Sequence, residues 1–327
     1  MPRSNRLTRA TVRATVIAAT AMVLGGIVAA CSSSPPGTGA AAAGTNGSSR
    51  FPVTIEAANG AVRVPARPTS IVSLTSTATE ILYAIGAGSQ VRAVDQYSDY
   101  PPQAPRTNLD AENPNVEAIA SYHPDLVVIG PGDSSSLNHQ LSALGIPVLY
   151  QPAPSGLVGA YAQFEQLGDA TGHSAQAVTE VTGIKSRIAS IVRDTPKPAS
   201  PATYYYELDQ TYYSVTSSTF IGQVLGLLGL KNIADAAKGA ASSGGYPQLS
   251  AEFIIKADPE YMFLADTICC AQSPSTVATR PGWSTLRAVR DGNVIGLDDD
   301  IASRWGPRVV DLLQTVASAL DKHPAAS

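Results

Sequence analysis

The sequence predicts an α/β protein made of two similar lobes, each with a mostly parallel sheet, joined by one long helix, with a cleft between the lobes. Three observations predict this fold. Short apolar segments alternate with helical segments over most of the chain, a long amphipathic segment crosses its middle without a proline, and the second half repeats a motif of the first half.

The first 30 residues have the pattern of a secretory signal. Arginines at positions 3, 6, 9 and 13 precede an apolar run over residues 16–30, which ends in small residues directly before Cys31. About 15 apolar residues suit a cleaved signal, whereas a membrane-spanning helix needs about 20. The run before Cys31 resembles a bacterial lipobox, which implies that residues 1–30 are removed and that Cys31 is lipidated.

Residues 31–50 then hold the lipidated Cys31 and a disordered tether. After the cysteine, this segment consists of Ser, Pro, Gly, Ala and other small or polar residues, with no large apolar side chain to bury. Such a linker is typical of a carrier that serves a membrane partner. We therefore expect an exported protein, anchored by lipid to the outer face of the cell membrane.

The charge balance excludes one class of partner. The 327-residue chain has a formal charge of −4, and loss of the four signal arginines leaves the mature chain near −8. Nucleic-acid binding depends on clustered Lys and Arg, so an acidic chain argues against it. No later segment is long and apolar enough to span a membrane.

Residues 51–172 are predicted to form the first lobe. It begins with a hairpin, residues 53–56 and 61–64, around an Asn59-Gly60 turn. Ser and Thr residues ahead of Glu80 predict a helix N-cap with a capping box. The further predicted strands are residues 71–74, 91–94, 126–129 and 147–150, and the predicted helices are residues 80–85, 116–121 and 137–144.

A connecting helix follows over residues 173–194. Apolar residues recur every three or four positions along it, and residues 195–201, with three prolines, end it. At 1.5 Å per residue it spans roughly 30 Å, about the width of a small domain. Residues 195–327 are therefore assigned to the second lobe.

The second lobe repeats the first. Residues 117–125 align without gaps on residues 252–260, and each segment leads into an apolar strand, 126–129 or 261–264. Residues 73–86 are also similar to residues 214–229, each expected to be a strand, a Ser/Thr-rich loop and an apolar helix. Two Rossmann-like lobes of this kind would direct the carboxyl ends of their strands, where ligands bind in open α/β sheets, toward one cleft.

At this point the chain resembles a family. Residues 53–320 are similar to the helix-hinged periplasmic binding proteins that serve ABC importers of cobalamin, ferric siderophores and haem. The similar stretches are residues 71–88, 97–104, 115–126, 246–252 and 300–308, and the run 97–104 (YSDYPPQA) is most like the cobalamin-binding member.

The resemblance implies a substrate-binding lipoprotein and no enzyme, with no cofactor of its own. Its implied partners are an ABC permease with its ATPase and a small metal chelate. Cobalamin or a related corrinoid is the first expectation for that ligand, and a ferric siderophore or haem is the alternative. A structural or adhesive surface lipoprotein is an alternative from another class.

The chain's 13 tyrosines suggest an aromatic pocket, because tyrosine offers a ring to stack and a hydroxyl to bond. By resemblance, Tyr97, Tyr213 and Tyr246 match aromatic ligand contacts of the cobalamin-binding member, and Asp300 and Arg304 match its polar contacts. Tyr100 and Trp305 complete the expected ligand-binding residues. The alternative is an ordinary Tyr-rich core or sheet surface.

Two features fit the cobalamin expectation poorly. The stretches near residues 110–111 and 131–132 lack the tryptophans of the cobalamin-binding member, and the acidic run 298–300 is unexpected for a ligand with a neutral rim. The run could pair with Arg304 or select a cationic group. For a haem ligand, Tyr97, Tyr212 or Tyr213 would be candidates for the axial position.

One glutamate of each lobe is a candidate for permease docking. In the family, an acidic residue on each lobe contacts permease arginines, and Glu117 and Glu252 occupy those positions. Arg–carboxylate pairs can be bidentate and so fix orientation. The alternative is that each glutamate only stabilises the first turn of its helix.

The adjacent Cys269 and Cys270 have three interpretations. Their Cα atoms are about 3.8 Å apart across a trans peptide, below the usual disulfide range, so a bond between them would be strained and would form a rigid turn at the cleft mouth. They are otherwise two free thiols, or they take part in intermolecular or redox chemistry. No motif of His and Cys with metal-ligand spacing exists, and no nucleophile or phosphate-loop motif appears.

Overall fold

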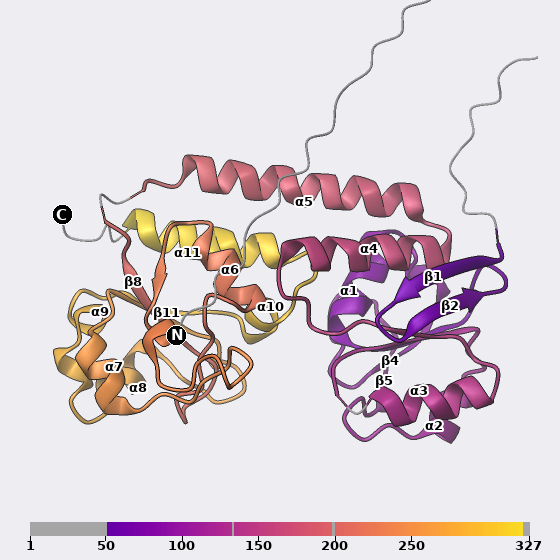
Figure 1. Ribbon diagram of the computed structural model, residues 1–327, viewed down its shortest axis with the longest axis horizontal. Helices are drawn as coiled ribbons and strands as arrows, with labels where there is room; N and C mark the ends of the chain where they lie inside the picture. The colour runs from indigo at the N-terminus through magenta and orange to yellow at the C-terminus, as the bar shows by residue number, and fades with distance from the viewer. Residues whose placement is uncertain (1–50, 133, 198–199, 323–327) are drawn as a thin grey trace, which may run out of the picture. The chain divides into compact units, whose positions relative to one another are not determined.

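The computed structural model describes residues 51–132, 134–197 and 200–322, which all belong to one compact unit, Thr45–Ser327. Its elements form two lobes, one around a five-stranded sheet and one around a four-stranded sheet (Figure 1). The predicted α/β fold with two lobes and mostly parallel sheets is confirmed. The predicted signal, the tether and Cys31 lie outside the described residues.

The sheet of the first lobe is parallel throughout, in the order β5-β4-β3-β6-β7. The buried strands β3 and β6 form its centre and are apolar apart from Ser73, as expected for strands covered on both faces. The bounds of these elements are β3 Ile71–Leu74, α1 Ser76–Ala84, β4 Val91–Asp95, β5 Arg106–Leu109, α2 Val116–Ala120, β6 Leu126–Ile129, α3 Ser134–Ala143 and β7 Val148–Tyr150.

Two local predictions in this lobe are wrong. The hairpin of β1 (Val53–Ala57) and β2 (Gly60–Val64) pairs Ala57 with Gly60, so its two loop residues are Ala58 and Asn59, not Asn59 and Gly60. Helix α1 begins at Ser76, and its N-cap, Thr75, makes no side-chain cap bond, so the capping box is absent. The Thr79 hydroxyl instead contacts the hydroxyls of Ser73 and Ser98.

The connecting helix is α5, Ser174–Asp194, and it buries the predicted stripe Ala177, Val181, Ile184 and Ile188. It packs on α4 (Leu157–Thr171) and α11 (Val309–Lys322). Figure 1 shows α5 extending along both lobes, with α4 and α11 beneath it. Helix α4 was not predicted. It contains Gly168, whose added Cβ would lie 2.6 Å from the Cβ of Ala177, so this glycine permits close helix packing.

The sheet of the second lobe is also parallel, in the order β11-β10-β8-β9. A long connection separates β8 from helix α6. Helix α7 precedes β10, just as α2 precedes β6 in the first lobe. The bounds are β8 Thr203–Glu207, α6 Phe220–Gly226, β9 Lys231–Asn232, α7 Ala251–Ala257, β10 Tyr261–Leu264, α8 Pro274–Ala278, α9 Arg287–Arg290, β11 Val294–Gly296 and α10 Asp299–Ser303.

The sequence repeat of residues 117–125 and 252–260 is reproduced in the backbone. His123 and Asp258, which align in the repeat, both adopt left-handed conformations, with φ of 49° and 45°. The residue that follows each Pro, Asp125 or Glu260, donates its N–H to Ser70 or Thr203 at the start of the neighbouring strand. This agreement assigns β3 and β8 as equivalent strands.

The predicted alignment of residues 73–86 on residues 214–229 is therefore wrong. Residues 214–216 were expected to be the equivalent of strand β3, but β8 holds that position and starts eleven residues earlier, at Thr203. Residues 208–218 form an insertion between β8 and α6. Their Ser/Thr-rich composition is similar to that of the segment after β3 in the first lobe, which explains the wrong alignment. Within the described ranges, no helix is long and apolar enough to cross a membrane.

Candidate ligand-binding site

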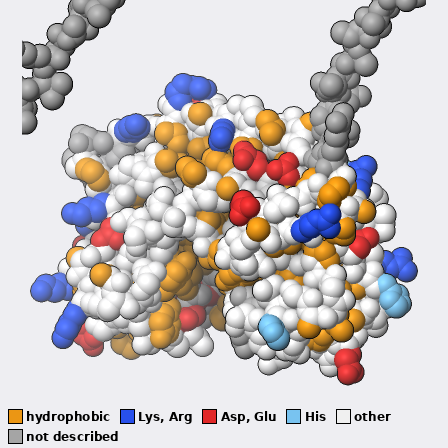
Figure 2. All heavy atoms as spheres, turned by 45° about the vertical axis from the view of Figure 1, so that its right-hand side comes forward, with side chains coloured by type: hydrophobic (Ala, Val, Ile, Leu, Met, Phe, Trp, Pro, Cys, Tyr) orange, Lys and Arg blue, Asp and Glu red, His pale blue; other side chains and the backbone are white. Residues whose placement is uncertain are grey.

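One segment of the second lobe reaches the first lobe. Residues 304–308 connect α10 to α11, and three of their side chains, Arg304, Trp305 and Arg308, contact residues of the first lobe. A further contact joins the lobes nearby, where the Gln223 amide donates to the carbonyl of Ser155. Figure 2 shows the surface hollowed between the two lobes, with hydrophobic side chains along the walls.

Glu80 of α1 is the centre of this contact, and its side chain is fully buried. Arg308 binds it through two bonds, Nη2 to Oε1 at 2.6 Å and Nε to Oε2 at 3.0 Å, and Arg304 Nη1 lies 3.1 Å from Oε1. Gly306 permits this approach, because a Cβ there would lie 3.2 Å from Oε2. A buried carboxylate between two guanidiniums is satisfied only while both lobes contribute.

Arg304 also binds two carboxylates that are partly exposed. Its Nη1 lies 3.1 Å from Asp99, its Nη2 donates to Asp300, and Nη2 lies 3.2 Å from the carbonyl oxygen of Tyr97. Glu80, Asp99, Asp300, Arg304 and Arg308 together form what we call the interlobe cluster. Three carboxylates and two guanidiniums give it a net charge of −1 when all are ionised.

The two partly exposed carboxyls of the interlobe cluster, Asp99 and Asp300, differ in acidity. Burial raises the pKa of Asp300, and the nearby Asp99 adds to the effect against the pull of Arg304. Burial also acts on Asp99, but the hydrogen bond and charge of Arg304 outweigh it and hold the pKa of Asp99 below its usual range. Asp99 thus keeps its charge, while Asp300 is the first of the two to take up a proton.

Trp305 links the lobes through a neutral contact. Its indole Nε1 donates to Oε1 of Gln163 at 2.6 Å, and the Gln163 amide donates to the carbonyl of Pro152, also at 2.6 Å. Gln163 lies in α4 and is buried. Trp305 is half-buried against the main core, so much of its ring serves lobe packing.

The tyrosines divide into two groups. Tyr204, Tyr205, Tyr206 and Tyr261 are buried in the strands of the second lobe, where the interpretation of a Tyr-rich core applies. The four tyrosines expected at the ligand are all exposed, with fractions of 48% for Tyr97, 41% for Tyr100, and 42% for both Tyr213 and Tyr246. Exposed aromatic rings of this number are available for contacts outside the fold.

The two exposed tyrosines of the first lobe flank the interlobe cluster. Tyr97 follows β4, and its carbonyl accepts from Arg304 and from the hydroxyl of Ser76. The guanidinium of Arg308 lies 4.2 Å from the ring centre of Tyr100, a cation–π contact that covers one face of that ring.

The two exposed tyrosines of the second lobe lie on an antiparallel ribbon in and beside the insertion. Tyr213 pairs with Gln248, and Ser214 donates to the carbonyl of Pro247, so Tyr213 and Tyr246 lie on adjoining segments. Leu208, just after β8, donates to the carbonyl of Tyr213 and ties this ribbon to the carboxyl end of the sheet.

Each residue of the acidic run has a different local role. Asp298 caps α10 by accepting from the N–H of Ile301, and Asp299 accepts from three consecutive N–H groups of residues 267–269. Only Asp300 joins the interlobe cluster. The run therefore places one carboxylate, not three, near Arg304, in agreement with the pairing that the sequence suggested.

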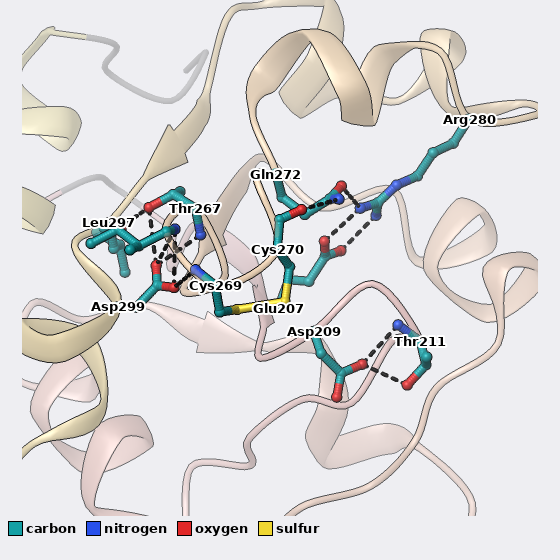
Figure 3. The surroundings of a disulfide bond; sticks show 11 residues. Glu207, Asp209, Thr211, Thr267, Cys269, Cys270, Gln272, Arg280, Leu297 and Asp299 are labelled. Atoms are coloured by element: carbon teal, nitrogen blue, oxygen red, sulfur yellow. Dashed lines mark hydrogen bonds and ion pairs between the residues drawn. A yellow bond between two sulfur atoms is a disulfide. The ribbon is translucent and has the colours of Figure 1, made fainter. Parts of the chain in front are cut away.

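A disulfide joins Cys269 and Cys270 just beyond β10 (Figure 3). Deeper in the lobe, Glu207 and Arg280 form a bidentate pair with both distances at 2.6 Å, and Arg280 lies over the ring of Trp283. Asp266 is fully buried near this pair. Burial raises its pKa to about 7, and the charge of Glu207 adds to the shift.

The two candidate docking glutamates hold equivalent places. Glu117 and Glu252 are exposed in the first turns of α2 and α7, which Asn115 and Ser250 cap with their side chains. Hydrogen bonds to its own backbone N–H and to Ser250 hold the pKa of Glu252 below its usual range. Both helix dipoles favour these carboxylates, so the alternative role in the first helical turn also has a structural basis.

Sequence reasoning missed three members of the interlobe cluster, Glu80, Asp99 and Arg308. Glu80 gave a signal, because it is a charged residue inside the apolar run of α1. Pockets of about 430 and 790 Å³ along α5 hold none of the predicted site residues. Among the described residues, no three His, Cys, Asp or Glu are grouped to hold a metal ion.

Two related proteins are similar in sequence to most of this chain. The chain is 30% identical over 279 residues to the uncharacterized ABC transporter substrate-binding lipoprotein YvrC of Bacillus subtilis, covering 83% of this chain and 86% of the relative. It is 29% identical over 279 residues to a cobalamin-binding protein of Halobacterium salinarum, covering 82% and 74%.

Solved structures agree with the fold. The periplasmic vitamin B12 binding protein BtuF of Vibrio cholerae matches with a TM-score of 0.66 and 25% identity over 80% of this chain and all of that one. A possible iron-binding periplasmic solute-binding protein of Staphylococcus epidermidis matches with a TM-score of 0.67 and 25% identity, over 78% and 99%. The family model for periplasmic binding proteins matches residues 71–301, more than half of the chain. The chain belongs to the periplasmic binding protein family.

Proposed function

We propose that this protein is the substrate-binding lipoprotein of an ABC importer and that its ligand is cobalamin or a related corrinoid. One observation carries the proposal. Four exposed tyrosines, two on each lobe, accompany a cluster of charged residues that joins the lobes and carries an excess of carboxylate.

The exposed rings suit a bulky ligand with apolar faces. Tyr97 and Tyr100 lie beside the interlobe cluster, and Tyr213 and Tyr246 lie on the ribbon at the carboxyl end of β8. Ligands of open α/β sheets bind at the carboxyl ends of the strands. Aromatic walls with a few polar anchors are the usual lining of such sites.

The charge of the cluster favours a ligand that donates hydrogen bonds. Arg304 already binds Glu80, Asp99, Asp300 and a backbone carbonyl, and only 10% of its side chain is exposed. The side chains of Asp99 and Asp300 are 41% and 35% exposed, so acceptor oxygens are what the cluster offers. Corrinoids carry amide N–H groups at their rim, whereas haem propionates and many ferric siderophores are anionic and would be repelled.

The remaining parts of the proposal concern the membrane. We propose that Cys31 carries the lipid, which agrees with the name of the relative from Bacillus subtilis. We also propose that Glu117 and Glu252 dock on arginines of the permease, one from each lobe. Their exposure and their equivalent places at the N-terminal turns of α2 and α7 support this role.

Equilibrium titration of the purified protein with cyanocobalamin, haemin and a ferric siderophore tests the ligand. We expect saturable binding of cyanocobalamin, and about thirtyfold weaker binding when both Tyr213 and Tyr246 are changed to Ala, since each of the two stacked rings contributes of the order of 1 kcal/mol. Leu144→Ala, a change at another exposed apolar residue, is the control.

The other outcomes separate the alternatives. Binding of haemin or a ferric siderophore in place of cyanocobalamin would replace the corrinoid by an iron chelate and would contradict the charge argument. Failure of all three probes to bind would reject the transport role and favour a structural or adhesive lipoprotein.

A further inference from the structure

The loop after β10 exposes apolar side chains beside a disulfide. Residues 268–270 comprise an exposed isoleucine and the two disulfide-linked cysteines, of which Cys269 is exposed. Ile268 is 66% exposed. Single exposed apolar residues are common. This loop differs because its backbone is held on both sides and it lies at the carboxyl end of β10.

The first side of the loop is held by one carboxylate. The Asp299 oxygens accept from the N–H groups of Thr267 at 2.8 Å, Ile268 at 3.0 Å and Cys269 at 2.7 Å. The Thr267 hydroxyl also donates to the carbonyl of Leu297 at 2.6 Å. Three successive N–H groups on one carboxylate fix the backbone direction through charge-assisted bonds.

The second side is held by a chain of contacts that ends in a buried ion pair. The side-chain amide of Gln272 donates from Nε2 to the backbone carbonyl of Cys270 at 3.1 Å, and its Oε1 accepts from Arg280 at 2.7 Å. Arg280 is itself bound by the buried Glu207. Figure 3 shows the disulfide between these two sets of contacts, with Asp299 on one side and Glu207, Gln272 and Arg280 on the other.

The loop also lies on the ligand side of the lobe. It follows the carboxyl end of β10, and the segment that it contacts, Leu297–Asp299, follows the carboxyl end of β11. Asp299 is next to Asp300, which binds Arg304 of the interlobe cluster. A short series of contacts therefore leads from the disulfide to Asp99 and Tyr97 of the first lobe.

We propose that Ile268 and the Cys269–Cys270 disulfide form an apolar contact surface for the ring face of the bound corrinoid, and that the oxidised form of the pair sets its shape. The proposal rests on the proposed function. The disulfide links adjacent residues and fixes the loop between its two held sides, so the apolar surface is presented in one orientation. Pre-organisation of this kind lowers the entropic cost of binding.

Reduction would undo this arrangement. A dithiol reductant supplies two electrons and two protons, the Sγ–Sγ bond breaks, Cys269 and Cys270 become thiols, and the reductant closes to its own disulfide. The exposure of Cys269 gives a reductant access. Asp299 and Gln272 still hold the two sides of the loop, so the fold is retained while the contact surface becomes mobile.

Titration with cyanocobalamin under oxidising and reducing conditions tests the proposal, together with Ile268→Ala and with the double change Cys269→Ser and Cys270→Ser. We expect about tenfold weaker binding in the reduced protein, in the double variant and in Ile268→Ala, which corresponds to about 1.4 kcal/mol. Val178→Ala, at a residue of α5 that is 56% exposed, is the matched control and should bind as the wild type does. Thermal unfolding of each form checks that the fold is kept.

The outcomes are distinct from those that test the ligand. If the wild type binds cyanocobalamin and either reduction or Ile268→Ala leaves the affinity unchanged, the contact surface is rejected while the proposed function stands. If the wild type binds haemin or the ferric siderophore and not cyanocobalamin, a contact surface for a corrinoid is rejected together with the proposed ligand. A wild type that binds none of the probes overturns the proposed function and this proposal together.

Discussion

The two lobes are equivalent at helices α2 and α7 and differ at the carboxyl ends of their strands. Helices α2 and α7 begin with a capped turn and an exposed glutamate, and each leads through a left-handed residue and a proline into a central strand. At the carboxyl ends of the strands the lobes differ. Strand β3 is followed almost directly by α1, whereas β8 is followed by the insertion 208–218 and β10 by the loop that holds the Cys269–Cys270 disulfide. The comparison teaches that a repeat can keep the same helix-to-strand arrangement in both halves while one half carries extra structure at the carboxyl ends of its strands.

The sharpest test of the equivalence, and of the proposed docking role, is charge reversal in both α2 and α7. In the double variant Glu117→Arg and Glu252→Arg, we expect ligand affinity to be unchanged and uptake by the reconstituted importer to be abolished, since each new arginine would face permease arginines. Each single reversal should give a partial loss. Glu165→Arg, on the exposed side of α4, is the control, and full uptake in the double variant would reject docking by these residues.

Two buried ion pairs can be compared. Glu80 with Arg308 joins the two lobes, and Glu207 with Arg280 lies within the second lobe. Glu80→Ala removes the carboxylate partner of Arg308, and Glu207→Ala removes that of Arg280. Each change should lower the free energy of unfolding by about 3–5 kcal/mol. Only Glu80→Ala should also increase amide hydrogen exchange in both α1 and the 304–308 segment, because Glu80 contacts both lobes. Equal exchange patterns in the two variants would contradict the bridging role.

The largest pH effect that we test is expected at Asp266 in the second lobe. Burial raises the pKa of Asp266 to about 7, so the folded state holds a proton that the unfolded chain releases near pH 4. This contribution to stability is complete below pH 4 and is lost as the pH rises through 7. Asp266→Asn should therefore match the wild type at pH 4 and exceed its stability at pH 8, by on the order of 2 kcal/mol.

Urea unfolding at several pH values between 4 and 8 measures this difference. Asp311→Asn, which removes a surface ion pair with Arg187, is the control and should follow the wild-type profile. Parallel profiles of the wild type and Asp266→Asn would show that the proton is not held at Asp266.

The smallest effect concerns the two left-handed residues. His123 is exposed, so His123→Gly relieves its backbone conformation and should stabilise the protein by about 0.5 kcal/mol. Asp258 accepts from the backbone N–H and the side chain of Arg287. Asp258→Gly should therefore destabilise by about 1 kcal/mol. Calorimetric melting measures both, and changes of the same sign would contradict this contrast.

Much of the fold could be predicted because its central strands and long helix have strong periodic patterns. Strands β6 and β10 and helix α5 lie within a residue of their predicted bounds. Strand β5 was missed because only Leu109 of its four residues is buried, and α4 because its two internal glycines read as breakers. The insertion 208–218 was mistaken for a strand and loop because local composition cannot show that β8 had already supplied the strand.

The site was predictable in part. All four tyrosines expected at the ligand are exposed, and Arg304 and Asp300 do pair. Their roles at a ligand stay predictions, because Arg304 is bound by carboxylates on several sides. The partners Glu80 and Asp99 lie more than 200 positions away in sequence. No local pattern shows that distant charges meet, so the interlobe cluster required the three-dimensional structure.

The chain has two tryptophans, and their placement makes the protein its own optical reporter. Trp283 is fully buried and stacks with Tyr212 inside the second lobe, whereas Trp305 donates its indole hydrogen to Gln163 of the first lobe. Ultraviolet emission from Trp305 therefore responds to separation of the lobes, while emission from Trp283 responds to the interior of one lobe. A Trp305→Phe variant resolves the two signals without any attached dye.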